Sequence, residues 1–155
     1  MGRILERIQS LGLELPAPPQ PVAAYIPAVH YGNLLYISGQ LPLKNGQLLS
    51  TGKVGQAVSL EDAYAAARQC TLNALSIAQD VLGDLDRIER VVRVGGFVQS
   101  ADGFSDQPKV INGASELLGE IFGEQGRHAR AAVGVNELPL NAAVEVEFLL
   151  GIAAS

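Results

Sequence analysis

Residues 59–83 read SLEDAYAAARQCTLNALSIAQDVLG, and this stretch predicts a long amphipathic helix. Apolar side chains recur at spacings of three and four from Leu60 to Leu82, which places them on one helix face. Ser59 can accept a hydrogen bond from a free N–H of the first turn, and Gly83 suits the left-handed conformation that ends many helices. The fold follows from what lies on either side of this helix.

Before the helix, β-branched and aromatic residues predict strands at about 23–30 and 34–40, with a turn at Gly32-Asn33 between them. A further hairpin is expected at residues 44–47, because Asn45-Gly46 suits the positive φ angles of a tight turn. Together these segments predict an antiparallel meander.

After the helix, strand and helix patterns alternate. A valine-rich segment predicts a buried strand over about 88–99, in which Gly95-Gly96 indicates a bulge or a close backbone approach. A second helix is predicted over about 108–122, because Pro108 suits a first helical turn and apolar residues then recur at helical spacing.

The chain ends with two predicted strands, over about 129–136 and 143–152. The full order is β-β-β-α-β-α-β-β. It predicts an α+β fold, in which both helices cover one face of a single mixed β-sheet. The other face must then be solvated or covered by a partner.

Two segments precede the strands. Apolar residues at helical spacing predict a short helix over about 3–11, and the prolines of residues 16–21 hold the chain extended. We therefore divide the chain into an N-terminal helical arm with its connector, residues 1–21, and one domain, residues 22–155. The arm is expected to pack on the core without taking part in chemistry.

The composition limits compartment and partners. The 155 residues are 48% apolar and 17% charged, with a net charge of −5 and one cysteine, Cys70, which we place in the core. The low charged fraction suggests a surface buried by other subunits. No secretion signal or membrane span is seen, so we expect a soluble, cytoplasmic protein. The three lysines and eight arginines are scattered, which disfavours nucleic-acid binding.

Familiar catalytic motifs are missing from the sequence. It contains no phosphate-binding loop, no paired cysteines and no metal-ligand spacing. His30 and His128 stand far apart and are expected to be surface or partly buried residues without a role in chemistry. Candidate functional residues must therefore be sought among polar side chains placed in apolar strands.

Arg130 lies in such a strand and shares its face with two small residues, Ala132 and Gly134. A guanidinium beside small side chains can bind a carboxylate through two parallel hydrogen bonds. Glu145 and Glu147 share a face of the last strand, where an acid can orient or deprotonate water. The alternative is that Arg130 and one of these glutamates form a buried or interfacial ion pair that serves packing.

Four separated motifs occur in order along residues 22–152. They are Ser38-Gly39-Gln40-Leu41-Pro42, Asn112, Arg130-Ala131-Ala132-Val133-Gly134-Val135 with Leu138-Pro139, and Val144-Glu145-Val146-Glu147. Together they resemble the RidA family of reactive enamine and imine deaminases, also called the YjgF family. The resemblance implies a chorismate-mutase-like α+β fold, a homotrimer and active sites between subunits.

The resemblance also assigns roles by position. Arg130 resembles the arginine that binds the substrate carboxylate, and Glu145 resembles the glutamate that orients the hydrolytic water. Substrate-binding positions are matched by Tyr25, Ser38, Gly39, Asn112 and Ala132. Because Ala132 stands where many members carry a cysteine, and because of the arm, the chain resembles a divergent subgroup.

Three functions are open to a chain of this kind. The leading hypothesis is hydrolysis of 2-aminoacrylate and related imines to 2-keto acids and ammonia, without a metal or cofactor. The second is a non-catalytic protein that binds a small carboxylate in the same intersubunit cleft. The third is endoribonuclease activity, a label attached to some relatives, which the acidic charge disfavours.

Overall fold

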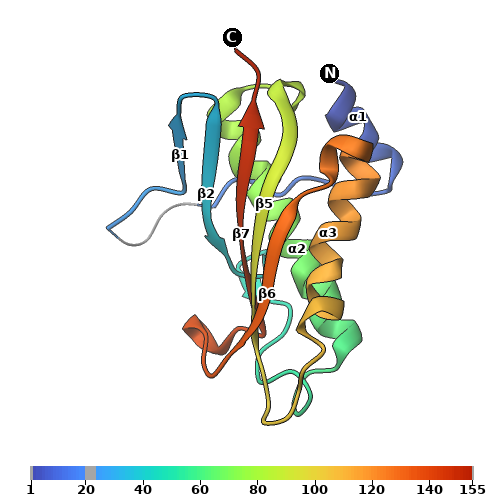
Figure 1. Ribbon diagram of the computed structural model, residues 1–155, viewed down its shortest axis with the longest axis vertical. Coiled ribbons are helices and arrows are strands. Elements are labelled where there is room, and N and C mark those ends of the chain that lie inside the picture. The colour runs from blue at the N-terminus through green and yellow to red at the C-terminus, as the bar shows by residue number, and fades with distance from the viewer. Residues whose placement is uncertain (1, 20–23, 155) are drawn as a thin grey trace.

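Five strands form the main sheet of the computed structural model, which describes residues 2–19 and 24–154. The strands lie in the order β1-β2-β7-β5-β6, and all neighbours are antiparallel except the parallel pair β5 and β6 (Figure 1). The sheet is therefore mixed, as predicted. Their bounds are β1 Ala28–Tyr31, β2 Leu34–Gln40, β5 Ile88–Gln99, β6 Ala129–Val135 and β7 Val144–Ile152.

Within the described residues, three helices accompany the sheet: α1 Arg3–Ser10, α2 Leu60–Leu82 and α3 Gln107–Phe122. Both α2 and α3 cover the same face of the sheet, which confirms the predicted layering (Figure 1). The predicted ends of α2 are also confirmed. The Ser59 side chain accepts a hydrogen bond from the Asp62 N–H, and Gly83 has the left-handed conformation. Short 3₁₀ turns, η1 Leu85–Arg87, η2 Gly123–Gly126 and η3 Pro139–Asn141, join the larger elements.

Two details of the predicted sheet are wrong. The hairpin at 44–47 exists, but β3 Leu43–Lys44 and β4 Gln47–Leu48 form a separate two-stranded sheet, so the sheet is not single. The first strand begins at Ala28 rather than near residue 23, because Pro27 has no N–H to donate to a ladder. Residue 23 and the end of the proline-rich connector lie outside the described residues.

The glycine pair in β5 causes no bulge. The register of β5 against β7 shifts between Ile88 and Arg90 and between Val91 and Arg93, whereas it is regular through Gly95-Gly96. The structure instead contains the alternative that was predicted, a close approach to the backbone. A side chain at Gly96 would collide with the Ile111 side chain of α3, so this glycine lets the helix pack closely on the sheet.

The N-terminal arm packs into the core. The Ile4 and Ile8 side chains of α1 are buried in the main hydrophobic cluster. The Asp86 carboxylate accepts hydrogen bonds from the Arg3 N–H at 2.9 Å and the Ile4 N–H at 2.8 Å, at the free start of α1. The domain boundary after residue 21 stays a prediction.

None of the helices within the described residues combines the length and apolar character needed to cross a bilayer.

Replacing Asp86 by alanine is expected to lower the free energy of unfolding by about 1 kcal/mol, the usual effect of losing a helix cap. The hydrogen bonds from the Ile4 and Arg3 N–H groups hold the pKa of Asp86 below its ordinary value. The stabilisation is therefore present above the ordinary aspartate pKa and is lost as the pH falls through the lowered one. Urea unfolding at one protomer concentration, at neutral and acidic pH, measures the effect, with exposed Asp102→Ala as control. A difference in the free energy of unfolding between wild type and Asp86→Ala that persists unchanged at acidic pH would contradict this role.

The second face of the sheet carries exposed apolar side chains. Tyr31 and Leu34 are at the β1–β2 end, Tyr36 is on β2, and Val133 is on β6. In the predicted layering this face stays free of helices, and none of the helices in the described part of the chain covers it (Figure 1). We call it the open face.

Candidate active site

Arg130 is half-buried on β6, where α3 supplies its partners. Its Nη1 donates to Asn112 Oδ1 at 2.9 Å and to Ser115 Oγ at 3.0 Å, and its Nη2 donates to the Pro108 carbonyl at 3.2 Å. Asn112 and Ser115 are three residues apart, so they share one face of the helix. No ion pair between Arg130 and a glutamate occurs among residues 2–19 and 24–154. The predicted packing ion pair is therefore wrong within one protomer.

The small residues beside Arg130 differ in their surroundings. Ala132 packs against the hydrophobic core. A Cβ at Gly134 would lie 2.7 Å from Gln107 Nε2, so the first side chain of α3 already occupies the space that the sequence suggested was free. Arg130 and Ala132 share a strand face as predicted, but the Gln107 side chain fills the space beside Gly134.

Glu145 lies on β7 and faces the open side of the sheet. Its carboxylate lies directly over Gly39, where any added side chain would collide with Glu145 Oε2. Burial raises the pKa of Glu145, and the nearby Glu147 carboxylate raises it further. Within the part of the chain that the structure describes, Glu145 forms no hydrogen bond or ion pair through its side chain. A half-buried carboxylate with a raised pKa is suited to accept a proton from water near neutral pH.

The Ser38-Gly39 segment forms the irregular step between β2 and β7. Ser38 Oγ donates to the Ile26 carbonyl at 2.9 Å, and the Ser38 N–H donates to the Pro27 carbonyl at 2.9 Å. Both donors of Ser38 are thus engaged, and only its oxygen lone pairs remain for a ligand. Tyr25, next to this anchored segment, is 56% exposed.

Arg130 and Glu145 lie on opposite faces of the sheet. Within β5, Val94 pairs with Arg130 and Phe97 pairs with Glu145. Residues three apart in a regular strand point to opposite sides, so the arginine faces α3 and the glutamate faces away from the helices. We call the two groups the arginine half-site, formed by Arg130, Asn112 and Ala132, and the glutamate half-site, formed by Glu145, Gly39 and Ser38.

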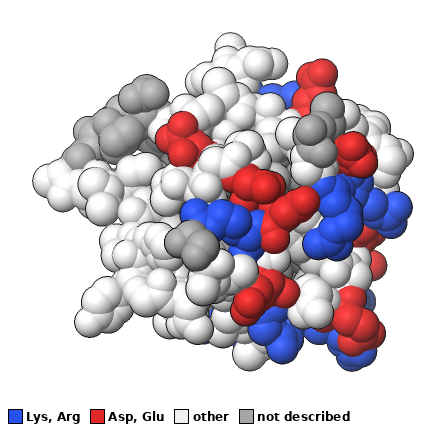
Figure 2. All heavy atoms as spheres, turned by 90° about the horizontal axis from the view of Figure 1, so that it is seen from above, with Lys and Arg blue, Asp and Glu red and all other residues white. Residues whose placement is uncertain are grey.

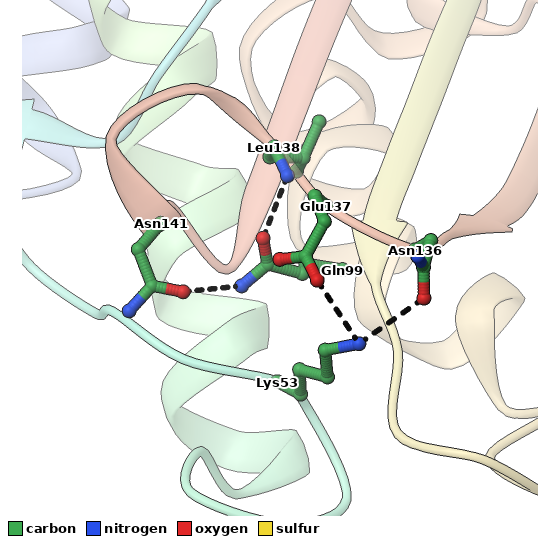
Figure 3. Close-up of polar contacts among 6 residues, drawn as sticks. All are labelled: Lys53, Gln99, Asn136, Glu137, Leu138 and Asn141. Atoms are coloured by element: carbon green, nitrogen blue, oxygen red, sulfur yellow. Dashed lines mark hydrogen bonds and ion pairs between the residues drawn. The ribbon is translucent and has the colours of Figure 1, made fainter.

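The loop between β6 and β7 is anchored by one fully buried side chain (Figure 3). Gln99 Oε1 accepts from the Leu138 N–H at 2.6 Å, and Gln99 Nε2 donates to Asn141 Oδ1 at 2.8 Å. Outside it, Lys53 Nζ donates to Asn136 Oδ1 at 3.2 Å and lies 3.6 Å from Glu137 Oε1. These contacts fix the connection between the strands that carry the two half-sites.

The sequence reasoning missed four polar residues beside the half-sites. His128 Nε2 lies 2.8 Å from Ser115 Oγ, which places both side chains next to Arg130. On the open face, the Tyr36 hydroxyl donates to Glu147 Oε2, and Arg93 Nη1 lies 3.8 Å from the same oxygen. Strand alternation gives no signal for Ser115, which lies on α3. His128 precedes β6 by one residue, so only its spacing of two from Arg130 could have linked these two residues.

The fold and site define a class of protein: an α+β protein with a helix-covered mixed sheet that carries a different polar half-site on each face. The chain belongs to the YjgF family, because a family model described as "YjgF/chorismate_mutase-like, putative endoribonuclease" matches residues 5–151. The described residues contain no cluster of three or more His, Cys, Asp or Glu side chains fit to hold a metal ion.

Three relatives illustrate the range of the family. Protein TCP17 of Trypanosoma cruzi is 46% identical over 96% of this chain and 94% of its own length. A crystal structure described as a "putative endoribonuclease" from Shewanella oneidensis is 35% identical, with a TM-score of 0.94, and the match covers 97% of this chain and 100% of that one. A 2-iminobutanoate/2-iminopropanoate deaminase of Dermatophagoides farinae is 29% identical over 90% of this chain and 94% of its own.

Proposed function

We propose that this protein hydrolyses small 2-imino acids to 2-keto acids and ammonia at sites formed between subunits of a homotrimer. The observation that carries the proposal is the half-buried Glu145 carboxylate, which faces the open side of the sheet with a raised pKa and no protein partner in the described chain. A distant relative named as an iminobutanoate deaminase supports the same chemistry.

Two protomers would each contribute one half-site. Arg130 of one subunit binds the substrate carboxylate, while Glu145 of the next lies beside the imine carbon. Because the two side chains face opposite sides of one sheet, a single protomer does not offer both to the same small molecule. The exposed apolar side chains of the open face support burial against another copy of the chain. The remaining predicted contacts, Tyr25, Ser38, Gly39, Asn112 and Ala132, would line the cleft.

The reaction needs no strong nucleophile, because an iminium carbon is already electrophilic. Glu145 takes a proton from water as the water oxygen bonds to the imine carbon, and the C=N electron pair moves to nitrogen, which gives a carbinolamine. Glu145 returns this proton to the nitrogen, which makes the nitrogen an ammonium leaving group. Glu145 then takes the proton of the carbinolamine hydroxyl as the C=O bond forms, the C–N bond breaks and ammonia leaves, and ammonia accepts that proton to become ammonium. Substrate and water thus become keto acid and ammonium without an external reductant or oxidant.

Charge distribution argues against RNA as the substrate. On the face seen from above, Lys and Arg side chains are interspersed with Asp and Glu instead of forming a patch of one sign (Figure 2). The net charge is −5. Neither feature suits the neutralisation of several neighbouring phosphates.

The proposal is tested by generating 2-iminopropanoate beside the purified oligomer and measuring keto acid and ammonia against spontaneous hydrolysis. Faster release of both products is expected, in equal amounts. A purified wild type that gives no acceleration with iminopropanoate, iminobutanoate or larger imines would contradict catalysis. If pyruvate still binds in that case and Glu145→Gln leaves its affinity unchanged, the site is a carboxylate-binding site without turnover.

The pH dependence of kcat/KM should report the ionisation of Glu145. Since the base must be ionised, activity is expected to fall as the pH decreases through the raised pKa of Glu145, at a higher pH than an ordinary glutamate would give. Replacing Glu147 by glutamine removes a neighbouring negative charge and should move this acidic limb to lower pH. Glu137→Gln, at an exposed carboxylate, is the control. An acidic limb that stays in place in Glu147→Gln would contradict the assignment.

A further inference from the structure

Two residues that the predicted site did not include, Ser115 and His128, complete the hydrogen-bond set of Arg130. We propose that they are positioning residues, which hold the Arg130 guanidinium so that two of its N–H bonds stay free for a substrate carboxylate. The inference rests on the proposed function for the identity of the ligand. The arrangement itself is a property of the protomer.

The contacts from Gly126 through His128 and Ser115 to Arg130 form a chain of hydrogen bonds. Its donors and acceptors can be assigned starting from the Gly126 carbonyl. His128 Nδ1 lies 2.6 Å from the Gly126 carbonyl oxygen, which can only accept, so Nδ1 carries the proton. In the neutral ring, Nε2 then accepts from the Ser115 hydroxyl at 2.8 Å. That leaves the Ser115 oxygen to accept from Arg130 Nη1 at 3.0 Å. Burial lowers the pKa of His128, the hydrogen bond to the Gly126 carbonyl raises it, and the charge of Arg130 lowers it. The net effect is a lowered pKa, which favours the neutral ring.

Counting the donors of Arg130 shows what remains for a ligand. A guanidinium has five N–H bonds in a fixed plane. Asn112 and Ser115 take both Nη1 donors, and the Pro108 carbonyl takes one Nη2 donor. Nε–H and the second Nη2–H have no acceptor among the described residues. Two donors therefore remain, one on Nε and one on Nη2, which is the number that a carboxylate engages in a bidentate pair.

The local geometry explains why both added residues are needed. Asn112 and Ser115 lie one turn apart on α3. His128 lies just before β6 and Arg130 is two residues later, so four side chains meet between the helix and the start of the strand. Without the Ser115 oxygen, one Nη1 donor is released and the guanidinium can rotate away. Without His128, the Ser115 hydroxyl loses the acceptor that orients it.

The kinetic test uses four variants of the native oligomer and a fifth as the control. Ser115→Ala and His128→Leu are each expected to raise KM for 2-iminopropanoate and the Kd of pyruvate by about tenfold, the effect of one hydrogen bond to a charged group, while kcat changes little. Ser115→Thr keeps the hydroxyl and His128→Gln keeps an acceptor, so both should recover most of the affinity. Ser10→Ala, at an exposed serine of α1, is the control. Equal KM in the wild type, Ser115→Ala and His128→Leu would overturn the proposal.

A ligand-free measurement separates this inference from the proposed function. Imidazole ¹⁵N shifts should place the proton of His128 on Nδ1, and the Arg130 Nη protons should give resolved, slowly rotating signals that collapse in Ser115→Ala. If these signatures are seen but the wild type neither binds pyruvate nor hydrolyses imines, the proposed function fails and the positioning chain stands. A proton on Nε2, or Arg130 signals that are unchanged in Ser115→Ala, overturns the proposed positioning of Arg130 by Ser115 and His128, whatever the activity.

Discussion

Replacing Arg130 by alanine is expected to lower kcat/KM for 2-iminopropanoate by about a hundredfold or more. Two charge-assisted hydrogen bonds to the substrate carboxylate are lost, and each is worth about 1.5–3 kcal/mol. Arg130→Lys should recover only part of the activity, because an ammonium group cannot present the planar pair of donors that Nε–H and Nη2–H form. Measured rates of keto acid release give the comparison directly.

Arg127→Ala provides the matched control for Arg130→Ala. Arg127 lies three residues earlier, and its side chain is exposed beside Glu124 at 3.8 Å. Its loss should leave kcat/KM and the circular dichroism spectrum unchanged. If Arg130→Ala folds, keeps its oligomeric state and retains full activity, Arg130 does not bind the substrate.

Much of the fold could be predicted because local patterns coincide with packing. Ser59 and Gly83 are recognisable as end signals of α2 in the sequence, and they are the residues that cap the helix in the structure. The strand β5 is recognisable as an apolar run. The start of β1 was predicted too early, since a run of β-branched and aromatic residues does not reveal that Pro27 precedes the first ladder bond. The separation of β3 and β4 into a second sheet depends on long-range pairing, which no local pattern contains.

The candidate site was predictable residue by residue but not as an arrangement. Alternation placed Arg130 with Ala132 and Glu145 with Glu147, and both pairings are confirmed. That the two groups face opposite sides depends on the register of β6 and β7 against β5. The contact of His128 with Ser115 joins a strand to a helix across thirteen residues, so neither residue stood out alone.

The assembly of each site from two protomers is tested most directly by mixing two inactive variants. Arg130→Ala and Glu145→Gln, co-expressed in equal amounts with one shared tag and purified without selecting mixed oligomers, should recover activity. A site is intact where a subunit that keeps Arg130 meets a neighbour that keeps Glu145, which random assembly gives at about one quarter of sites.

A double variant carrying both substitutions, mixed equally with wild type, gives the matched control. It too should show about one quarter of wild-type activity if two protomers build the site, and about one half if one protomer suffices. The result we predict is therefore the same partial activity in both mixtures. An inactive mixture of the two single variants, with half activity in the control mixture, would contradict a site shared between subunits.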